Sequence, residues 1–495
     1  MSTKDAKLNK EYDEAYEFIC HKEIDSADET IVSDELSVIY RKIDLRILSI
    51  LCGIYFLQFL DKTLLNYAAV MGIKKNLVGN QFSDLATILY VSYIVFEPVS
   101  AYLFQVLPPA KFFAACIICW GIVVVMHIFC QTYASLMVIR MLLGCFEACV
   151  APGCIMITGM WWNKKQQLRR MGLWSIQAGT STIFGGLLSF AFQHVDSTKT
   201  SLASWQIFFL LMGLITILYG VYVMIELPNN PTSAKFLNDR EKMLVLENIR
   251  ENQTGTENKV FKKEQIKELC IDPHTWPMFF LTVISMVATG AIITFSVTII
   301  SSFGFTAKQS ALVQMPVGLS TILSIVGATY LCAYFNGNYR TYIFISLLVP
   351  AIIGYIVLLT TYNRIGNLLA IYLINTGTCV ITMIYSWNGA NTAGHTKRLA
   401  RNCLTMIAFA IGALIGPQLF KAEDYPHYIP AKITLLVLTI VCIPLSLFVR
   451  YLSIKINRQR DLDVEGNEKW LKEVGDNYQF KDLTDIENKM FRYSY

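Results

Sequence analysis

The chain has 495 residues, of which 54% are hydrophobic and only 16% are charged. A soluble protein carries about 25% charged residues, so this composition excludes an ordinary soluble domain and indicates a protein embedded in a lipid bilayer. The net charge of +5 is too small to predict a nucleic-acid partner.

Residues 1–43 are polar and acidic, and we expect them to form a cytosolic tail without a cleavable signal peptide. The 13 cysteines are scattered mainly through apolar runs. Cys116 and Cys119 form a CxxC pair, but no further ligands accompany them. We therefore expect cysteines that pack in the interior, with no metal site and no cofactor.

Twelve apolar runs approach the roughly 20 residues that a helix needs to cross a bilayer. They lie near 45–68, 84–104, 112–130, 135–160, 171–193, 205–226, 276–300, 309–333, 341–360, 367–387, 402–420 and 432–453. So many spanning runs, joined mostly by short polar loops, would be hard to cover in a soluble protein. The sequence predicts an all-α membrane protein of twelve transmembrane helices.

A charged stretch divides these helices into two sets of six. We expect a first half at 44–227, a cytosolic middle loop at 228–275, a second half at 276–454 and a cytosolic tail at 455–495. The short loops 162–170 (WNKKQQLRR) and 395–401 (HTKRLAR) are basic and contain no acid. Because basic loops stay in the cytosol, both termini are expected there.

The first helix contains the stretch FLQFLDKTLLNYAAV, with charges inside an apolar run. Lys62 and Asn66 are four residues apart and share a helix face, which Tyr67 extends. These three residues are candidates for binding an anionic substrate. Asp61 is a candidate for holding a cation in place and for proton coupling. The alternative for Lys62 is a side chain that reaches the membrane surface from near a helix end.

The fourth helix contains RMLLGCFEACVAPG, in which Arg140 and Glu147 are seven residues apart. This spacing puts them on one face, about 10 Å apart along the axis. A charge at mid-bilayer costs roughly 2.5–3.5 kcal/mol, so such residues usually serve a function. We expect Arg140 to bind substrate and Glu147 to couple to protons. The alternatives are that Arg140 reaches the interface and that Glu147 pairs with a cation on another helix.

Other polar residues occupy the helices with less specific meaning. His127 is typical of an interfacial histidine, and Glu97, before Pro98, indicates packing or gating near the cytosolic side. The second half has almost no charge in mid-helix, which favours hydrogen-bond recognition there, with Asn388 as a candidate substrate contact. Its polar residues are Thr294, Ser296, Gln314, Asn375, Tyr385, Asn388 and Gln418.

Several stretches together resemble the fungal allantoate permease family, in the anion:cation symporter group of the major facilitator superfamily. They include FLDKTLLNYA, RMLLGCFEACVAPG, MWWNKKQQLRRMGLW, DPHTW, NTAGHTKR and GALIGPQLF, over roughly residues 40–455. The matching motif residues are Gly144, Pro152, Asn391, Gly394, His395, Lys397, Arg398, Gly416 and Pro417. Three features depart from this group: a Gly-x-x-x-Asp-Arg-type loop is missing, Gln166 stands where Glu is frequent, and Ala413 where Asn is frequent.

The resemblance implies the major facilitator fold and proton-driven uptake of organic anions at the plasma membrane. The spacing of Arg140 and Glu147 is also similar to that of animal vesicular glutamate and sialic acid transporters. There the arginine contacts the substrate carboxylate and the glutamate couples to protons. The helix-one arginine of those relatives corresponds to Lys62 here.

The sequence thus predicts a secondary active transporter that takes up a small organic anion by proton symport. The anion would be a carboxylate or sulfonate, such as a ureido acid, dipeptide, vitamin or sulfur compound. An enzyme is not expected, because no cluster of acid–base or metal-ligand spacing lies at the membrane edge. We expect a monomer. The alternatives are a permease-like nutrient sensor that does not transport, and a facilitator without proton coupling.

Overall fold

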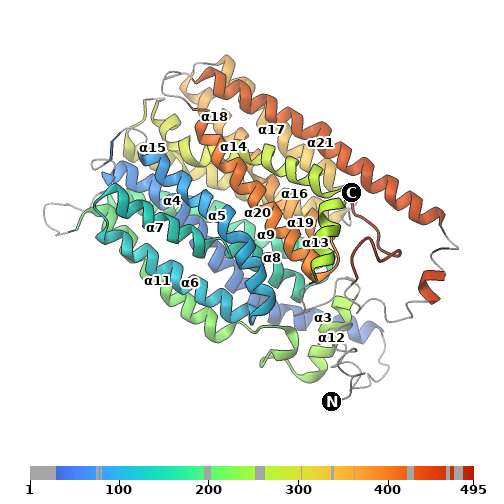
Figure 1. Cartoon of the computed structure of the whole chain (residues 1–495). Helices are drawn as coiled ribbons and strands as arrows, with labels where there is room; N and C mark the ends of the chain where they lie inside the picture. Colours follow the sequence, from blue (N-terminus) through green and yellow to red (C-terminus); the bar gives the residue numbers. More distant parts are fainter. Residues whose placement is uncertain are drawn as a thin grey trace.

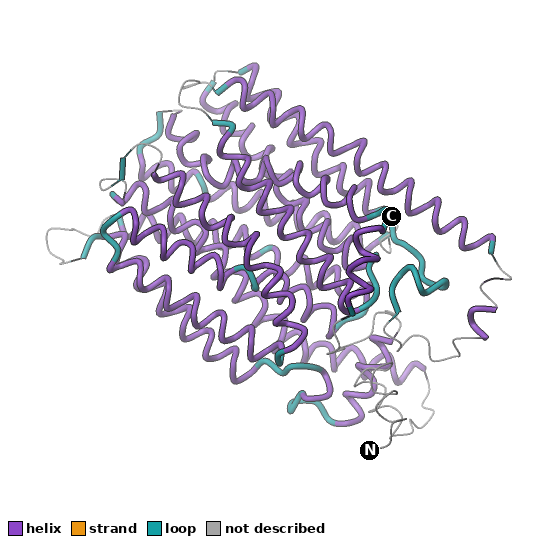
Figure 2. The backbone as a smooth tube through the Cα atoms, viewed as in Figure 1, coloured by secondary structure: helices purple, strands orange, loops and turns teal. Residues whose placement is uncertain are grey.

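The computed structural model describes most of the chain, and all its regular elements are helices. The described residues are 29–73, 77–78, 81–193, 202–250, 262–302, 304–335, 339–361, 363–420, 428–463, 466, 469–472 and 483–495. Within these residues there is no strand, and the long helices run roughly parallel to one another (Figures 1 and 2). The expected all-α fold is therefore confirmed.

The first half begins with two helices and continues through six membrane segments. These elements are α3 (Glu29–Ile43), the π-helix η1 (Asp44–Leu48), α4 (Ser49–Met71), α5 (Gln81–Val106), α6 (Pro109–Met126), η3 (His127–Phe129), α7 (Tyr133–Glu147), α8 (Val150–Trp161), α9 (Lys164–Ser175), α10 (Gln177–Phe192) and α11 (Ser204–Glu226). Helix α3 lies within the expected N-terminal tail, whose residues 1–28 lie outside the described residues.

The second half repeats this plan after a polar segment with short helices. These elements are η4 (Pro231–Ser233), α12 (Asp239–Arg250), α13 (Lys263–Ile271), α14 (Thr275–Ser302), α15 (Ala307–Val313), α16 (Met315–Tyr334), α17 (Arg340–Thr360), α18 (Arg364–Ile374), η5 (Asn375–Cys379), α19 (Val380–Ala390), α20 (His395–Gln418) and α21 (Ile429–Leu462).

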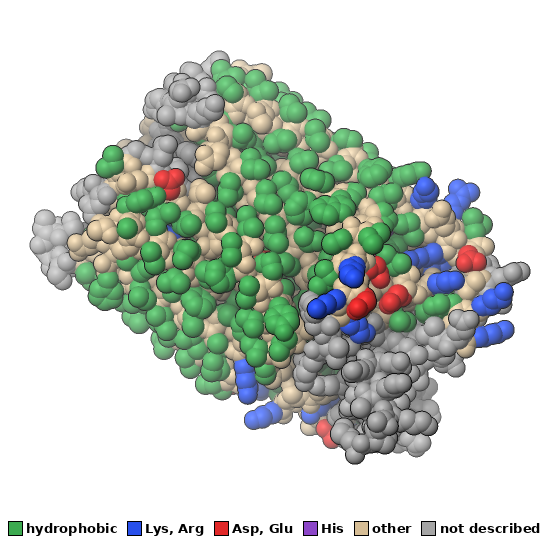
Figure 3. Space-filling model, in the orientation of Figure 1, with side chains coloured by type: hydrophobic (Ala, Val, Ile, Leu, Met, Phe, Trp, Pro, Cys, Tyr) green, Lys and Arg blue, Asp and Glu red, His purple; other side chains and the backbone are tan. Residues whose placement is uncertain are grey.

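The described residues contain eleven helical segments long and apolar enough to cross a membrane. The remaining expected run, 171–193, is covered by α9 and α10, which are two shorter helices that meet at Ile176. Hydrophobic side chains cover the flank of the bundle, whereas charged side chains gather at one end of it (Figure 3). This distribution fits a bundle that spans a lipid bilayer.

We call this charged end the basic end and define it by Arg169, Arg170, Lys397, Arg398 and Arg401. Each half has a bonded Asp–Arg pair there. In the first half, Arg170 of α9 lies 2.8 Å from Asp44, just before α4. In the second half, Arg401 of α20 lies 2.7 Å from Asp272, just before α14. Each half thus ties its first membrane helix to its fifth in the same way.

The two halves contact each other at the basic end. Gln105 of α5 donates a hydrogen bond of 2.9 Å to the Thr396 hydroxyl of α20. Nearby, a side chain added at Gly172 of α9 would overlap Thr329 of α16. The basic end is therefore closed between the halves in this structure.

The segment 483–495 packs against the second half at this end. Asp485 is fully buried and lies 2.9 Å from the Lys397 ammonium. Phe491 and Tyr493 are also buried, and the Asn391 and Trp387 side chains both donate to the Ser494 carbonyl. This part of the expected C-terminal tail is an integral part of the fold.

Candidate functional site

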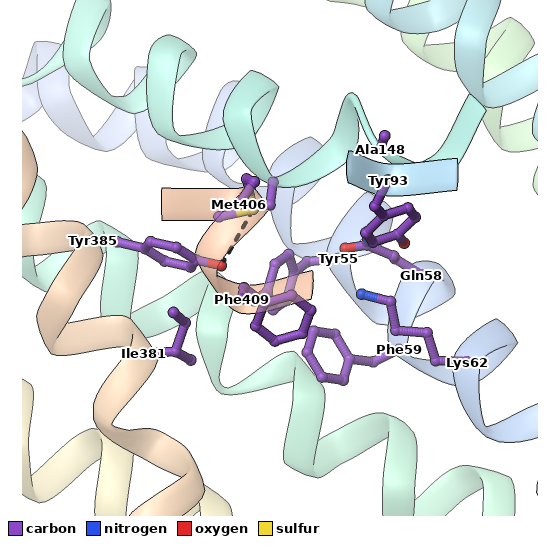
Figure 4. A pocket seen from close by; sticks show the side chains of 11 residues that line it. Tyr55, Gln58, Phe59, Lys62, Tyr93, Ala148, Ile381, Tyr385, Met406 and Phe409 are labelled. Carbon is purple, nitrogen blue, oxygen red and sulfur yellow. Dashed lines mark hydrogen bonds between the residues drawn. The ribbon is translucent and has the colours of Figure 1, made fainter. Parts of the chain in front are cut away.

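A cavity of about 370 Å³ lies between the two halves (Figure 4). It is lined by Tyr55, Gln58, Phe59, Lys62, Tyr93, Ala148, Ala151, Ile381, Tyr385, Met406 and Phe409. Both halves contribute, so a ligand held here would contact each of them.

One face of α4 supplies the first four of these residues. Tyr55, Gln58, Phe59 and Lys62 follow the spacing i, i+3, i+4, i+7, which places side chains on one side of a helix. The opposite wall comes from α19 and α20, where the Tyr385 hydroxyl lies 3.6 Å from the Met406 sulfur. The cavity is thus largely aromatic, with one cation on its wall.

The Lys62 ammonium is the positive group of the cavity. Its Nζ lies 3.7 Å from Oε1 of Glu147, which is fully buried. The same atom lies 5.1 Å from the ring centre of Phe59, 5.4 Å from that of Tyr93 and 5.6 Å from that of Phe409. Aromatic faces attract cations at such distances, so rings and a carboxylate together hold Lys62 in place.

Several polar atoms beside Lys62 have no hydrogen-bond partner among the described residues. They are the Gln58 amide oxygen, the Tyr93 hydroxyl and both carboxyl oxygens of Glu147. Buried polar atoms without partners are costly, and most are satisfied by water or by a ligand. The site therefore offers an ammonium, a hydroxyl and a carboxyl group to a polar ligand.

Arg140 is buried and does not line the cavity, although Glu147 acts on it electrostatically. Asp61 acts on it electrostatically and accepts a hydrogen bond of 2.9 Å from the Trp120 indole. Arg140 is 3% exposed, so it does not extend to the membrane surface in this structure. His127 is fully buried, and its Nδ1 donates to the Val123 carbonyl.

Two other expected substrate contacts, Tyr67 and Asn388, also lie away from the cavity lining. The Tyr67 hydroxyl donates to the Thr182 carbonyl, and the Asn388 amide donates to the Thr405 hydroxyl at 2.8 Å. Asn66 lies in α4, but its side chain is outside the described residues. Of the four substrate-binding candidates whose side chains are described, Lys62 alone lies in the cavity wall, with Glu147 beside it.

Two of the family-motif glycines allow close packing between helices. At Gly144, an added side chain would meet the Leu89 carbonyl of α5, and at Gly416 it would overlap the Val287 carbonyl of α14. Gly394 begins α20 with a φ of 88°, which a residue with a side chain rarely adopts. These residues therefore shape the bundle at a distance from the cavity.

The remaining motif residues lie at or next to the ends of α8, α19 and α20. Lys397 is fully buried and lies within 3.3 Å of Glu268, Asp272 and Asp485. Asn391 bonds to Ser494 in both directions. Pro152 lies in the first turn of α8, His395 and Arg398 are buried in the first turn of α20, and Pro417 lies in its last turn.

The Asp272 carboxyl, outside the membrane segments, has a pKa well below its usual range. Burial alone would raise this pKa, but the neighbouring His274, Arg401 and Lys397 outweigh burial. The charge network at the basic end therefore stabilises ionised Asp272 in the folded protein.

Two of the three departures in sequence, Gln166 and Ala413, have structural explanations. Gln166 accepts a bond from the Asn163 backbone, while the Asn163 side chain caps α9 in return. Glutamine thus completes this capping box as glutamate would. Ala413 lies where α20 meets Gly290 of α14, and an added side chain at Gly290 would strike its backbone. A small residue suits that contact.

Sequence reasoning missed the aromatic wall of the cavity, including Tyr55, Phe59, Tyr93 and Phe409. The signal was present in α4, where Tyr55, Gln58 and Phe59 share the face of Lys62. No sequence pattern links Tyr93 and Phe409 to Lys62. They come close to it because α5 packs against α20.

Comparisons with known proteins agree with this architecture. The family model described as the Major Facilitator Superfamily matches residues 51–460. The chain is 51% identical over 467 residues to the thiamine pathway transporter THI73 of Saccharomyces cerevisiae, covering 94% of this chain and 87% of that protein. It is 31% identical over 471 residues to the allantoate permease of the same yeast, covering 92% and 85%.

Solved structures show the same fold at low sequence identity. The human organic anion transporter MFSD10 (TETRAN) is 13% identical, with a TM-score of 0.60, and the match covers 81% of this chain and 99% of that one. The E. coli fucose:proton symporter FucP is 14% identical, also with a TM-score of 0.60, covering 81% and 98%.

Proposed function

Since the chain belongs to the major facilitator superfamily, in its fungal allantoate-permease-like group, we propose that it takes up a small organic anion together with protons. The observation that carries this proposal is the ion pair of Lys62 with Glu147 at the wall of a cavity shared by both halves. A carboxylate or sulfonate fits the ammonium, and the aromatic rings suit the rest of a small organic molecule.

The pair also supports a coupling mechanism. When the acid group of a substrate approaches Lys62, it competes with Glu147 for the same ammonium. Glu147 then loses its cation while remaining buried, and an unpaired buried carboxylate is strongly disfavoured. It is relieved by taking up a proton. One substrate anion and one proton would therefore bind together, with no net change of charge in the site.

The basic end is the cytosolic side in this proposal. Basic loops of membrane proteins stay in the cytosol, and Arg169, Arg170, Lys397, Arg398 and Arg401 all lie at this end. The protein would act in the plasma membrane as a monomer. Closure of the basic end then corresponds to a state from which substrate cannot enter the cytosol. Rocking of the halves about the cavity would open that route.

The test is uptake by cells that express the protein, compared with cells that carry an empty vector. Labelled ureido acids, dipeptides, vitamins, cysteine and sulfonates are offered at acidic and at neutral external pH. We expect accumulation of one anion that increases at acidic pH and collapses with a protonophore. Uptake that only equalises concentrations would indicate a facilitator. No uptake, with the protein confirmed at the cell surface, would favour a sensor.

A matched pair of variants links this uptake to the cavity. Lys62→Gln removes the ammonium from the cavity and should abolish uptake of the anion. Lys263→Gln removes an exposed lysine on α13 and should leave uptake unchanged. Equal uptake by both variants would overturn the role of Lys62.

A further inference from the structure

A second glutamate lies close to the cavity without lining it. Glu97 of α5 is 1% exposed, and neither of its carboxyl oxygens has a hydrogen-bond partner among the described residues. The mechanism above makes no use of it. An ionised carboxylate cannot be stable in such a place without a cation, so this group needs either a proton or a partner.

The position of Glu97 follows from its place on α5. It is four residues after Tyr93, so the two side chains share one face of the helix, about 6 Å apart along its axis. Tyr93 lines the cavity, and α5 runs toward the basic end, where Gln105 meets Thr396. Glu97 therefore lies one turn beyond the cavity wall, on the side of the basic end.

The charged neighbour of Glu97 is Lys62, which acts on it electrostatically as it does on Glu147. The other titratable groups that interact with it are Cys149 between α7 and α8, Tyr385 on α19 and Cys403 on α20. Thiols and phenols are ordinarily neutral near pH 7. The described part of α6, which also packs on α5, adds no charged group that acts on Glu97. Lys62 thus interacts with three acids, Glu147, Asp61 and Glu97.

A count of charges indicates that one acid holds a proton. The described membrane helices of the first half bury two cations, Lys62 and Arg140, and three acids, Asp61, Glu97 and Glu147. Neutrality requires one of the three acids to be protonated. Asp61 has Arg140 and the Trp120 bond, and Glu147 has Lys62 at 3.7 Å. Glu97 is the acid left for the proton.

The backbone next to Glu97 can also change shape. Pro98 follows it inside α5, and proline cannot donate the hydrogen bond to the carbonyl four residues earlier. Kinks in helices occur at such positions. A small bend at this point would move the Glu97 carboxyl relative to Lys62.

We propose that Glu97 is a second proton site of the carrier, on the release side of the cavity, and that Lys62 pairs in turn with Glu147 and with Glu97. In the transport cycle Glu97 first loses its own proton toward the basic end and pairs with Lys62. A proton then leaves the Glu147 carboxyl and reaches the Glu97 carboxylate, so that Glu147 becomes the carboxylate and Lys62 returns to it. The Tyr93 hydroxyl acts on the Glu147 carboxyl, although the two groups are not within hydrogen-bond geometry in this structure. Tyr93 also lies one helical turn from Glu97. It is the group placed to relay the proton.

This inference rests on the proposed proton coupling, but its first test needs no substrate. Infrared spectra of the purified full-length protein, titrated in heavy water, distinguish protonated carboxyl groups from carboxylates. We expect a buried protonated-carboxyl signal at neutral pH in the wild type and its loss in Glu147→Gln, because two cations then face two acids and Lys62 pairs with Glu97. The signal should be absent in Glu97→Gln. The exposed Glu264→Gln on α13 is the matched control and should keep it.

Glu97→Asp guards against failure of the glutamine variant to fold, because it keeps a carboxyl group at the same place. Its signal should shift in frequency rather than disappear. A signal that is unchanged in both Glu97 variants would overturn the proposal. A wild type without any protonated-carboxyl signal would overturn it as well.

Transport then separates this inference from the proposed function. With the anion identified by the uptake panel, Glu97→Gln should exchange it but no longer accumulate it above the external concentration. Normal accumulation by Glu97→Gln, with coupling intact in the wild type, would refute the role of Glu97 alone. A wild type that keeps the infrared signal but shows no proton-driven uptake would refute the proposed function alone.

Discussion

Asp61 and Arg140 lie on different helices, α4 and α7, and interact inside the first half while Trp120 donates a hydrogen bond of 2.9 Å to Asp61. The aspartate thus has a positive group and a neutral donor, and both partners are away from the cavity lining. This arrangement indicates that the cluster supports the first half, and that the Lys62–Glu147 pair is the one exposed to substrate.

The first prediction concerns Arg140. Arg140→Gln leaves Asp61 as a buried charge without its cation, and breaking such a pair typically costs about 3–5 kcal/mol. We expect a clear fall in the thermal unfolding temperature of the purified protein. Adding Asp61→Asn to the same chain removes the orphaned charge and should restore part of the stability. If the double variant is no more stable than Arg140→Gln, the two residues are not coupled.

The second prediction concerns Glu147. Glu147→Gln cannot take up a proton and no longer competes for Lys62, so substrate should still bind. We expect exchange of labelled anion across the membrane to persist while proton-driven accumulation is lost. The measurement is uptake with and without a protonophore. Accumulation equal to that of the wild type would remove Glu147 from the coupling role.

The third prediction concerns two helical glycines. Gly416→Ala would drive a methyl group into the Val287 carbonyl and force α20 away from α14, so the variant should be destabilised or fail to assemble. Gly327→Ala is the control, because its added carbon would meet nothing within 4 Å. Alanine is also the better helix former by roughly 0.5–1 kcal/mol. Size-exclusion chromatography of both purified variants measures how much of each is folded and monodisperse. Equal profiles for the two variants would contradict the packing of α20 on α14 described here.

The fourth prediction concerns pH and the basic end. The pKa of Asp272 is lower in the folded protein than the usual value of about 3.9 in an unfolded chain. Its contribution to stability is therefore present above that unfolded value and is lost as the pH falls through the folded one. We expect Asp272→Asn to unfold at a lower temperature than the wild type at neutral pH.

The difference between the two proteins should begin to shrink as the pH falls below about 4, because the Asp272 carboxyl of the unfolded wild-type chain then takes up a proton. It should shrink further as the pH approaches the lower pKa of the folded protein. Thermal unfolding curves over a series of pH values measure this difference. Asp84→Asn, at an exposed position near the opposite end of α5, is the control. A difference that stays constant with pH would show that Asp272 acts through its shape and not through its charge.

Much of the architecture follows from the sequence, because a bilayer imposes long apolar runs and basic loops that can be read directly. The buried charges Lys62, Arg140 and Glu147 are also visible as exceptions within those runs. Their positions on the faces of α4 and α7 do not reveal which of them share a cavity. Arg140 and Glu147 have the same helix face, yet only Glu147 reaches Lys62.

The rest depends on contacts between segments far apart in the chain. Phe409 is near Lys62 because α20 crosses α5, and Asp485 is near Lys397 because the segment 483–495 folds back. No hydrophobic periodicity or residue spacing in the sequence predicts either contact. A charged tail such as 455–495 has the composition of a solvated segment, and only the structure shows part of it to be buried.

The matching pairs Asp44–Arg170 and Asp272–Arg401 have a consequence for how the polypeptide can be divided. Both residues of each pair belong to the same half. The ion pair that joins the first membrane helix of a half to its fifth therefore needs no residue from the other half. Two separate polypeptides, ending and beginning in the polar stretch 228–262, should each insert and then associate into a working carrier. Each half would then fold as an independent unit, and the shared cavity would form when the two halves associate.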